Sequence, residues 1–339
     1  MNLGSPESTS VKDVRRYLNE FLMDEKVIDI PYLARVLLVK GIVVPFRAPK
    51  SAEAYKTIWT KDGSPLIVLT QQLQQQLQQL VTEPVEIAMR YGSPTPAAAF
   101  EKLMQRMPGL EEVIAVPLYP HYAMASYETA VDFAKEIHAK NNYPFRLSFI
   151  KPFFDEADYI KAMVENMKPY LNEDYDHILF SYHGVPERHL KKTDPTKCHC
   201  LKVENCCEVK SEAHAFCYRH QCFATTSLVT QALNIPKEKY SISFQSRLGK
   251  GWLQPFTDIR LEQMPNEGIK KLVILCPAFV SDCLETLEEI EERGKESFMK
   301  AGGVSYKMIP CLNTHPMWLD VLKKWVNEIA DGKTEMLLK

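Results

Sequence analysis

The sequence predicts an α/β protein made of two similar doubly wound domains, each with a parallel sheet covered by helices. The length of 339 residues suits two domains of roughly 100–200 residues each. A content of 45% hydrophobic and 25% charged residues is typical of globular proteins. From Val85 onward, short apolar runs alternate with helical patterns, which favours parallel sheets with crossover helices. We place the crossover between the halves at Lys151–Pro169.

The same patterning assigns the individual elements. An amphipathic helix opens the chain at Val11–Leu22. We predict strands at Val85–Tyr91, Val113–Leu118, Phe145–Ile150, His177–Ser181, Tyr240–Phe244, Leu272–Cys276 and Val304–Ile309. We predict helices at Pro96–Met107, Tyr127–Ala139, Glu156–Leu171, Thr225–Leu233, Cys283–Lys300 and Trp318–Ala330.

Composition argues against several function classes. The chain has 41 Lys and Arg against 43 Asp and Glu, so no basic surplus indicates nucleic-acid binding. It has 13 glycines, where average usage would give roughly 24, and lacks both GxGxxG and GxxxxGK[ST], so no nucleotide cofactor is expected. The N-terminus shows no secretory signal or transit peptide. Nine cysteines in that context indicate a reducing compartment, where a local cluster is more typical of a metal site than of disulfides.

A mostly apolar run extends over Ile28–Phe46. It contains Arg35 and Lys40, and two charges of this kind argue against a membrane-spanning helix. Two interpretations stay open. The run is either a buried helix pair or an exposed apolar lip that places Arg35, Lys40, Arg47 and Lys50 near lipid headgroups.

Polar and aromatic side chains follow five of the predicted strands. Open parallel sheets bind ligands outside the carboxyl ends of their strands. The residues delivered there are Arg90–Tyr91, Tyr119–Tyr122, Ser181–Gly184, Gln245–Arg247 and Ser281–Asp282. Five such endings together favour a ligand cleft between the two halves.

His183 is the best candidate for a general base. It lies just past a strand and beside Gly184, which allows a ligand and the backbone to approach closely. A neutral imidazole can accept a proton or contact a metal near neutral pH. His121 is a weaker second candidate, and His177, inside a strand, is expected to be a core residue.

An acidic helix follows the strand Leu272–Cys276. Its residues Glu285, Glu289 and Glu292 share one helical face. A solvated face near a helix N-terminus is the plain interpretation. Because the helix follows directly on a buried strand, its first turn should face the cleft, which favours a functional role for Glu285.

In order along the chain, these endings resemble the motifs of the ferrochelatase family, whose members insert Fe²⁺ into a porphyrin to make haem. The matching blocks are Asn2–Pro6, Arg90–Tyr91, Tyr119–Tyr122, Ser181–Pro186, Phe244–Gly249 with Trp252–Leu253, and Pro277–Leu287. The resemblance implies two similar domains around a porphyrin cleft. They are 1–150 with a lip at 28–46, 151–312 with an insertion at 198–222, and a C-terminal helix in 313–339 that packs back on the first domain.

The resemblance also implies roles for single residues. His183 corresponds to the active-site histidine, and Glu285 to the carboxylate facing it across the macrocycle; both would meet Fe²⁺. Glu289 lies on the same helix, which in the family contains a π-bulge, and would relay protons or iron together with Asp282. The implied porphyrin contacts are Leu3, Arg90, Tyr91, Tyr119, Tyr122, Ser126, Gln245 and Trp252.

The substrate implied is protoporphyrin IX, converted to protohaem in the last step of haem biosynthesis. Leu3 stands where coproporphyrin-using members carry a tyrosine. A coproporphyrin ferrochelatase, a non-catalytic porphyrin or haem carrier, and a redox sensor with a vestigial cleft are alternatives. The presence of both His183 and Glu285 argues against a carrier, which needs no base opposite an acid. The family has a complete apolar strand before Asn2, so we expect a truncated first strand or a misplaced start at Met1.

Six of the nine cysteines lie in a segment that looks like an insertion. Animal members ligate a [2Fe–2S] cluster through a C-terminal extension, but here no cysteine follows Cys311 and Met124 occupies the matching early position. Some bacterial members hold a cluster with an internal segment, so the resemblance implies a [2Fe–2S] cluster here. Four of six cysteines would bind it, preferably Cys207, Cys217 and Cys222, then Cys200 or Cys198, with Cys206 the remaining member. A zinc site with His199, His214 or His220, or free thiols, are alternatives.

These features together indicate a bacterial enzyme. We expect a cytoplasmic protein attached peripherally to the inner face of the cytoplasmic membrane through the lip. Porphyrin handover with neighbouring haem-pathway enzymes and a structural or sensing role for the cluster are further expectations.

Overall fold

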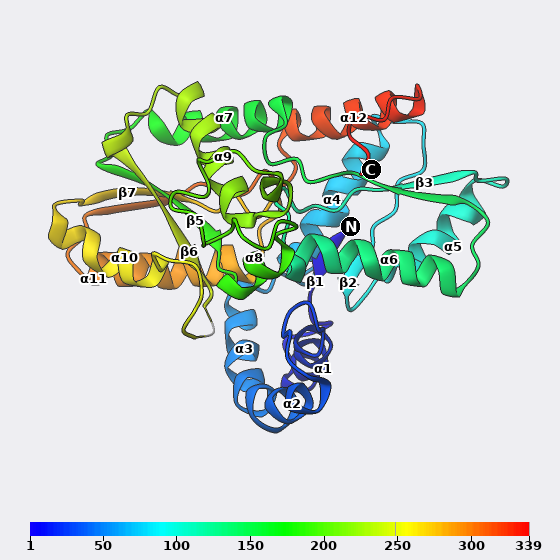
Figure 1. Ribbon diagram of the computed structural model, residues 1–339, viewed down its shortest axis with the longest axis horizontal. Coiled ribbons are helices and arrows are strands. Elements are labelled where there is room, and N and C mark those ends of the chain that lie inside the picture. The colour runs from blue at the N-terminus through cyan, green and yellow to red at the C-terminus, as the bar shows by residue number, and fades with distance from the viewer. Residues whose placement is uncertain (248, 339) are drawn as a thin grey trace. The chain divides into compact units, whose positions relative to one another are not determined.

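The structure is a computed structural model that describes residues 1–247 and 249–338 (Figure 1). The chain divides into two compact units. Unit 1 comprises Met1–Leu118, Met124–Lys151 and Leu319–Lys339, and unit 2 comprises Tyr119–Ala123 and Pro152–Trp318. Each unit is built around a parallel sheet, as the alternation of apolar runs and helical patterns predicted.

The sheet of unit 1 contains four short parallel strands: β1 (Asn2–Gly4), β2 (Met89–Tyr91), β3 (Glu112–Ala115) and β4 (Arg146–Phe149). β1 pairs with β2, and β3 pairs with β4. Met1 joins the two pairs, because its amine donates to the Val116 carbonyl at 2.7 Å and its carbonyl accepts from the Leu118 amide at 2.8 Å. The resulting order is β2-β1-β3-β4, and the tail after the last helix pairs with the end of β4 through the Ile150–Leu337 bridge.

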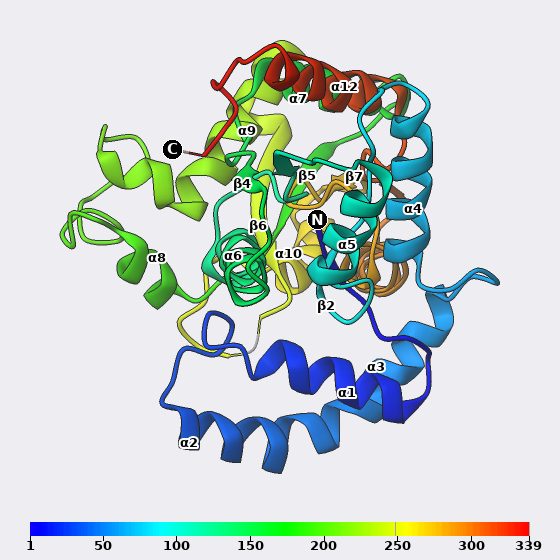
Figure 2. The ribbon, with the colours of Figure 1, turned by 90° about the vertical axis from the view of Figure 1, so that its right-hand side faces the viewer.

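The helices of unit 1 fall into two groups. α4 (Pro65–Gln78), α5 (Pro96–Arg106) and α6 (Thr129–Lys140) accompany the sheet, whereas α1 (Val11–Leu22), α2 (Tyr32–Val36) and α3 (Val44–Ile58) form a separate layer with α1 beside α3 (Figure 2). The start of α1 is set by a side-chain cap: the Ser10 hydroxyl accepts a hydrogen bond from the Asp13 backbone amide. Two π-helical segments, η1 (Leu37–Val43) and η2 (Met124–Glu128), interrupt this unit. α12 (Pro316–Ala330) closes the helical part of the chain.

Unit 2 repeats the strand order of unit 1. Its strands are β5 (His177–His183), β6 (Tyr240–Gln245), β7 (Lys271–Leu275) and β8 (Ser305–Met308), in the order β6-β5-β7-β8. β5 is the central strand, pairs on both edges and is buried along almost its full length, as expected for a strand of a parallel sheet with helices on both faces. In both units the first and third strands along the chain, β1 and β3 or β5 and β7, lie in the centre, so each sheet has a switch point at the carboxyl ends of its central strands.

Helices cover both faces of the unit 2 sheet. α7 (Ala157–Leu171) and α9 (Tyr218–Ala232) lie on one face, and α10 (Thr257–Gln263) and α11 (Lys295–Lys300) lie on the other (Figure 1). The core beneath α10 and α11 includes Leu261 and Phe298, packed with Leu179 and Ile274 from the strands. The short helices α8 (Glu187–Thr193), η3 (Glu212–Phe216), η4 (Lys237–Lys239) and η5 (Met264–Glu267) complete the unit.

Most predicted elements are present, although many of their ends differ by one to three residues and three differ more. The strand expected at Val85–Tyr91 is reduced to β2, because the Val85 carbonyl accepts from the side chains of Gln74 and Arg106 rather than from a neighbouring strand. α9 begins seven residues before the predicted Thr225. The helix predicted at Cys283–Lys300 is π-helical over Glu285–Gly294, the segment η6, before it continues as α11.

The lip, residues 28–46, is exposed and is not a buried helix pair. Leu33, Leu37 and Phe46 have exposed fractions of 75%, 72% and 75%. The expectation that Arg35 faces headgroups was wrong: its exposed fraction is 8%, and its guanidinium donates to the carbonyls of Ile28 and Ile30. Among the described residues, no helix is both long enough and apolar enough to cross a membrane.

Candidate active site

His183 ends the central strand β5, at the carboxyl edge of the unit 2 sheet. Its Nδ1 lies 2.7 Å from the carbonyl oxygen of Gly184. A carbonyl oxygen can only accept, so Nδ1 carries the proton and Nε2 carries the lone pair of the neutral ring. The side chain is half-buried and its ring contacts that of Phe279 edge-on. The tautomer that this bond selects is the one in which Nε2 can accept a proton.

Gly184 is required by the close approach of β5 and β6. Its amide donates to the Gln245 carbonyl at 2.7 Å, and a Cβ at this position would lie 2.7 Å from that same oxygen and 3.3 Å from the Trp252 ring. Any larger residue would push the ends of the two strands apart. The glycine therefore holds His183 in register with Gln245.

Gln245 is buried, and both the oxygen and the nitrogen of its side-chain amide form hydrogen bonds inside the protein. Its Oε1 accepts from the Ser181 hydroxyl at 2.6 Å, and its Nε2 donates to the Glu285 carbonyl at 3.0 Å. These bonds connect the end of β6 to the first residue of η6. In this structure Gln245 thus positions Glu285, rather than presenting its amide to a ligand.

Glu289, one of the five glutamates of η6, interacts with the charges of His183 and of Glu285. Glu289 accepts from the Ser246 amide at 2.9 Å and from the Ser246 hydroxyl. Burial raises the pKa of Glu289, and the charge of Glu285 raises it further, whereas the Ser246 bonds and the charge of His183 lower it. Unit 2 therefore brings the imidazole and both carboxyls into one electrostatic group. Glu292, predicted on the same face, is exposed, because the wider turn of a π-helix changes the facing of successive residues.

Asp282 is buried before η6 and is fully engaged. Its carboxylate accepts from the Asn313 amide at 2.6 Å, from the Thr286 hydroxyl at 2.9 Å and from the Cys311 backbone amide at 3.3 Å. These contacts hold the loop that leads from β7 into η6. A structural role accounts for all of them.

The other two histidines considered from the sequence are core residues. His121 is buried, its Nε2 lies 2.9 Å from the Thr225 hydroxyl, and burial lowers its pKa to about 3. His177 is buried and its Nε2 lies 2.8 Å from the Ser241 hydroxyl, as expected for a core residue. Neither competes with His183 as a base.

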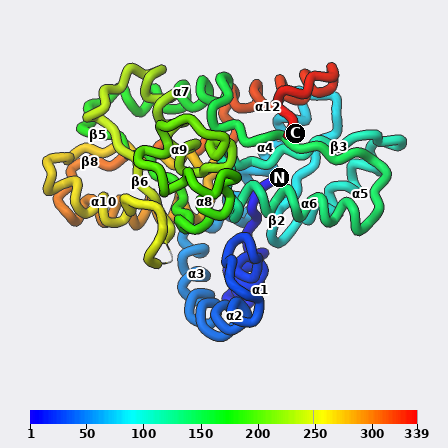
Figure 3. The backbone as a smooth tube through the Cα atoms, viewed as in Figure 1, coloured from blue at the N-terminus to red at the C-terminus, as the bar shows by residue number. Residues whose placement is uncertain are grey.

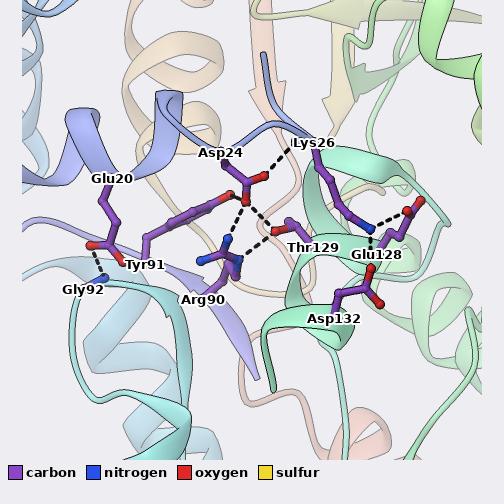
Figure 4. A network of polar contacts seen from close by, with 9 residues as sticks. All are labelled: Glu20, Asp24, Lys26, Arg90, Tyr91, Gly92, Glu128, Thr129 and Asp132. Atoms are coloured by element: carbon purple, nitrogen blue, oxygen red, sulfur yellow. Dashed lines mark hydrogen bonds and ion pairs between the residues drawn. The ribbon is translucent and has the colours of Figure 1, made fainter. Parts of the chain in front are cut away.

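The expected porphyrin contacts divide between the units. Leu3 on β1, Arg90 and Tyr91 on β2, and Ser126 on η2 belong to unit 1, whereas Tyr119, Tyr122, Gln245 and Trp252 belong to unit 2. Within unit 2, Trp252 pairs with Pro186 beside Gly184, and the Tyr122 ring contacts that of Phe216 edge-on. Within unit 1, the side chains of Arg90 and Tyr91 meet at Asp24, a residue that sequence reasoning missed (Figure 4).

The cysteine segment, residues 198–222, runs from the loop after α8 into the start of α9 in unit 2 (Figure 3). Asp194 organises its start, since its carboxylate accepts from the amides of His199 and Cys200 at 2.8 and 2.9 Å. The imidazoles of His199 and His214 both donate to the Cys206 carbonyl, at 2.7 and 2.9 Å. The segment is thus folded by carboxylate and imidazole contacts to its own backbone.

Four thiols of this segment interact with one another. Cys217 accepts hydrogen bonds from the thiols of Cys207 and Cys200; the bond from Cys207 contributes most to lowering the Cys217 pKa to about 6. Cys206 interacts electrostatically with both Cys200 and Cys207. Cys198 is exposed and faces Thr196. The thiol of the buried Cys222 is hydrogen-bonded to the oxygen of Tyr218, whose own proton goes to the His183 carbonyl.

The donor set fits an iron–sulfur cluster in number and chemistry, because a [2Fe–2S] cluster takes four thiolates. The geometry is not preformed: over residues 1–247 and 249–338, no three His, Cys, Asp or Glu side chains converge as metal ligands. Loading would therefore require these thiols to move from mutual contact onto the metal.

The fold is shared with two solved structures of SirB. SirB from Bacillus subtilis, solved with Fe³⁺, matches 79% of this chain and 92% of its own with a TM-score of 0.52 and 16% identity. The sirohydrochlorin chelatase SirB from Bacillus subtilis subspecies spizizenii, in complex with cobalt, matches 83% and 96% with a TM-score of 0.54 and 14% identity.

The family model for Ferrochelatase matches residues 1–330. The chain is 49% identical over 325 residues to a ferrochelatase of Pseudomonas entomophila, covering 95% of this chain and 96% of that protein. It is 50% identical over 326 residues to a ferrochelatase of Opitutus terrae, covering 95% and 94%. This chain belongs to the ferrochelatase family, and it inserts Fe²⁺ into a porphyrin for haem synthesis.

Proposed function

We propose that this ferrochelatase acts on protoporphyrin IX, with Nε2 of His183 as the base that removes the pyrrole protons. The observation that carries the proposal is the grouping of His183, Glu285 and Glu289 at one edge of the unit 2 sheet. Metal insertion requires the porphyrin to lose two N–H protons while the iron loses its water ligands. An imidazole and two carboxyls supply a base and a set of charged oxygens for these two tasks.

His183 is suited to proton removal by its hydrogen bonding. The Gly184 carbonyl holds the proton on Nδ1, so Nε2 accepts, and the imidazolium that results keeps its bond to that carbonyl. The nearby Glu289 carboxyl interacts with the charge of His183 and would stabilise the imidazolium. The proton can then pass towards the acidic helix.

Glu289 and Glu285 are suited to proton relay. Because burial raises the Glu289 pKa, this carboxyl holds a proton at higher pH than an exposed glutamate does. An arriving cation reverses the balance, since positive charge favours the ionised carboxylates. We assign Glu285, beside the buried Gln245, to contact Fe²⁺, and Glu289 to relay protons. Asp282 supports the helix start from behind.

The porphyrin contacts expected from the sequence are assigned residue by residue. Arg90 would pair with a carboxylate of the porphyrin, and the aromatic side chains of Tyr91, Tyr119 and Trp252 would contact its apolar rim. Binding energy gained at the rim can bend the macrocycle and expose its nitrogen lone pairs, which is strain directed to the transition state.

We assign the preference for protoporphyrin IX over coproporphyrin III to Leu3. It is half-buried on β1 next to β2, and leucine offers no hydroxyl to a propionate. We therefore assign protoporphyrin IX. The test compares kcat/KM for protoporphyrin IX and coproporphyrin III in the wild type and in Leu3→Tyr. The wild type should prefer protoporphyrin IX and the variant should shift towards coproporphyrin III; a wild type that prefers coproporphyrin III refutes the assignment.

We also infer a [2Fe–2S] cluster bound by Cys200, Cys206, Cys207 and Cys217, the four thiols that interact with one another. Thiolates close to each other repel, and a cluster relieves that repulsion by neutralising them. This set keeps the expected Cys207 and Cys217, favours Cys200 over the exposed Cys198, and exchanges Cys222 for Cys206. Such a cluster would supply a redox-active iron site close to the strand end that holds His183, because the hydroxyl of Tyr218, next to Cys217, donates to the His183 carbonyl at 2.9 Å.

Attachment to the membrane surface is the third part of the proposal. The exposed Leu33, Leu37, Ile42 and Phe46 lie on consecutive turns of α2, η1 and α3 and form an apolar surface on the lip. A soluble protein seldom exposes so many large apolar side chains together unless they bind something. Protoporphyrin IX is itself poorly soluble and partitions into lipid, so we assign this surface to a bilayer. Handover with neighbouring haem-pathway enzymes stays a prediction.

A further inference from the structure

A buried polar network in unit 1 is centred on Asp24 (Figure 4). Its Oδ2 accepts from the Tyr91 hydroxyl at 2.8 Å, from the Thr129 hydroxyl at 2.5 Å and from Nη2 of Arg90. Thr129 also accepts from Nε of Arg90 at 2.7 Å. One carboxylate therefore fixes both residues of the Arg90–Tyr91 pair.

The network determines which nitrogen of Arg90 can reach a ligand. The Arg90 guanidinium lies 4.3 Å from the ring centres of both Tyr91 and Phe133, so stacking restrains its plane. Nε and Nη2 are engaged by Thr129 and Asp24. Nη1 is the remaining nitrogen, with no hydrogen-bond partner within the described parts of the chain, and the side chain keeps an exposed fraction of 13%.

Asp24 also anchors the turn that leads into the lip. Its Oδ1 accepts from the Lys26 amide at 2.7 Å, and its carbonyl accepts from the Ile28 amide at 2.9 Å. The Lys26 ammonium pairs with Glu128 and Asp132, and Arg35 bonds to the carbonyls of Ile28 and Ile30 from the lip side. Both ends of the turn are therefore held by hydrogen bonds. The end next to the sheet is held by Asp24, whose carboxylate also binds Arg90.

The charge of Asp24 is maintained by these contacts. Burial alone would raise its pKa, but the bonds from Thr129 and from the Lys26 amide, together with the charge of Arg90, lower the pKa below its ordinary value. The side chain has an exposed fraction of 5%. A buried carboxylate satisfied on all sides is a rigid acceptor, and rigidity is what the positioning of Arg90 requires.

We propose that Asp24 is a positioning residue for the porphyrin. It orients Arg90 and Tyr91 so that Nη1 of Arg90 meets a propionate carboxylate, and it ties that contact to the turn that carries the lip. The inference rests on the proposed function, in which Arg90 contacts a porphyrin carboxylate. It adds Asp24, the nitrogen of Arg90 that meets the carboxylate, and a link between this contact and the turn that leads into the lip.

The test is Asp24→Asn, which keeps the size of the side chain and removes its charge. Because hydrogen bonds to charged groups are among the stronger ones, KM for protoporphyrin IX should rise at least about tenfold. kcat and KM for the metal should stay within about twofold, because the metal-inserting groups are untouched. The same assay is repeated with protoporphyrin dimethyl ester, which has no carboxylate. The variant and the wild type should then have equal KM, which a general loss of structure would not produce.

Two variants separate the possible failures. Asp132→Asn is the matched control: it removes one partner of Lys26, leaves Glu128 in place and should not change KM for protoporphyrin IX. Arg90→Ala should raise KM to a similar extent, and the double variant should add little to either single change. A normal KM in Arg90→Ala overturns the proposed Arg90 contact itself. A raised KM in Arg90→Ala with a normal KM in a folded Asp24→Asn overturns only the positioning role.

Should Asp24→Asn fail to fold, Thr129→Val carries the test. It removes the hydroxyl that joins Arg90 Nε to Asp24. The expected result is a smaller rise of KM that again disappears with the dimethyl ester. An equal rise of KM with both porphyrins overturns the proposal.

Discussion

The Nδ1 atom of His183 lies 2.7 Å from the carbonyl oxygen of Gly184. The same glycine donates its amide to the Gln245 carbonyl, and Gln245 donates in turn to the Glu285 carbonyl. A chain of backbone and amide bonds thus runs from the imidazole to the first residue of the acidic helix. Its consequence is that disturbing Gly184 should disturb the position of the base and of the acid together.

Gly184→Ala should be destabilising and should slow metal insertion. The new Cβ would lie 2.7 Å from the Gln245 carbonyl oxygen, and overpacking of this kind costs about 1–3 kcal/mol. Urea unfolding and Zn²⁺ insertion into protoporphyrin, followed by fluorescence, measure the two effects. Gly41→Ala, whose Cβ would meet no atom within 4 Å, is the control and should be neutral or slightly stabilising, because alanine restricts the unfolded chain more than glycine does. Unchanged stability and turnover in Gly184→Ala would contradict the account of this contact.

Glu289→Gln should make stability less sensitive to rising pH. The folded-state pKa of Glu289 is raised above its ordinary value of 4.5. As pH rises, the unfolded state therefore loses this proton first, and the folded state is progressively destabilised until its own pKa is passed. The variant lacks this penalty, so its melting temperature relative to the wild type should increase as the pH rises from about 4.5 through the raised pKa of Glu289. Glu292→Gln is the control: this residue is exposed on the same helix, so its melting temperature relative to the wild type should not depend on pH in this way. If the melting temperature of Glu289→Gln relative to the wild type falls as the pH rises, the pKa of Glu289 is not raised in the folded state.

The lip should bind bilayers through apolar contact. Wild-type protein should sediment with phosphatidylcholine vesicles and stay bound at about 0.5 M NaCl, where exposed charge pairs are screened. Leu37→Asp should lose most of this binding, because a charge in the apolar zone opposes insertion. Val304→Asp, at a residue 65% exposed in unit 2, is the control and should bind like the wild type. Release of the wild type by salt would refute an apolar contact.

The cysteine segment should give anaerobically purified protein a visible absorbance, with two irons and two sulfides per chain as the cluster type requires. Cys206→Ser should abolish the absorbance. Cys222→Ser should keep it, because the Cys222 thiol is hydrogen-bonded to Tyr218 and is not one of the four proposed ligands. Colourless wild-type protein with stoichiometric zinc would rule out the cluster. Retained absorbance in Cys206→Ser, with loss in Cys222→Ser, would restore Cys222 as the fourth ligand.

The strand ends were predictable because their signals are local. His183 and Glu285 each follow an unmistakable apolar run, and parallel strands bring their carboxyl ends to one edge. The exposure of the lip was not predictable. The apolar pattern of Ile28–Phe46 suits a buried pair as well as a surface, and only the packing of α1 against α3 decides which faces remain outside.

The roles of Asp24 and Gln245 could not be predicted from the sequence. Asp24 is separated from Arg90 by 66 residues, and nothing in its neighbourhood distinguishes it from a solvated carboxylate after a helix. Gln245 stands at a strand end, where a ligand-facing amide and a buried one have the same sequence pattern. Long-range hydrogen bonds decided both cases, and no periodicity encodes them.

The most direct test of the central claim is single-turnover metal insertion by His183→Ala, measured alongside porphyrin binding by fluorescence quenching. The account predicts that the variant binds protoporphyrin IX as the wild type does, while its insertion rate falls about 10²- to 10⁴-fold, the usual contribution of a positioned general base. Insertion at the wild-type rate with porphyrin bound would contradict the assignment of His183 as the base.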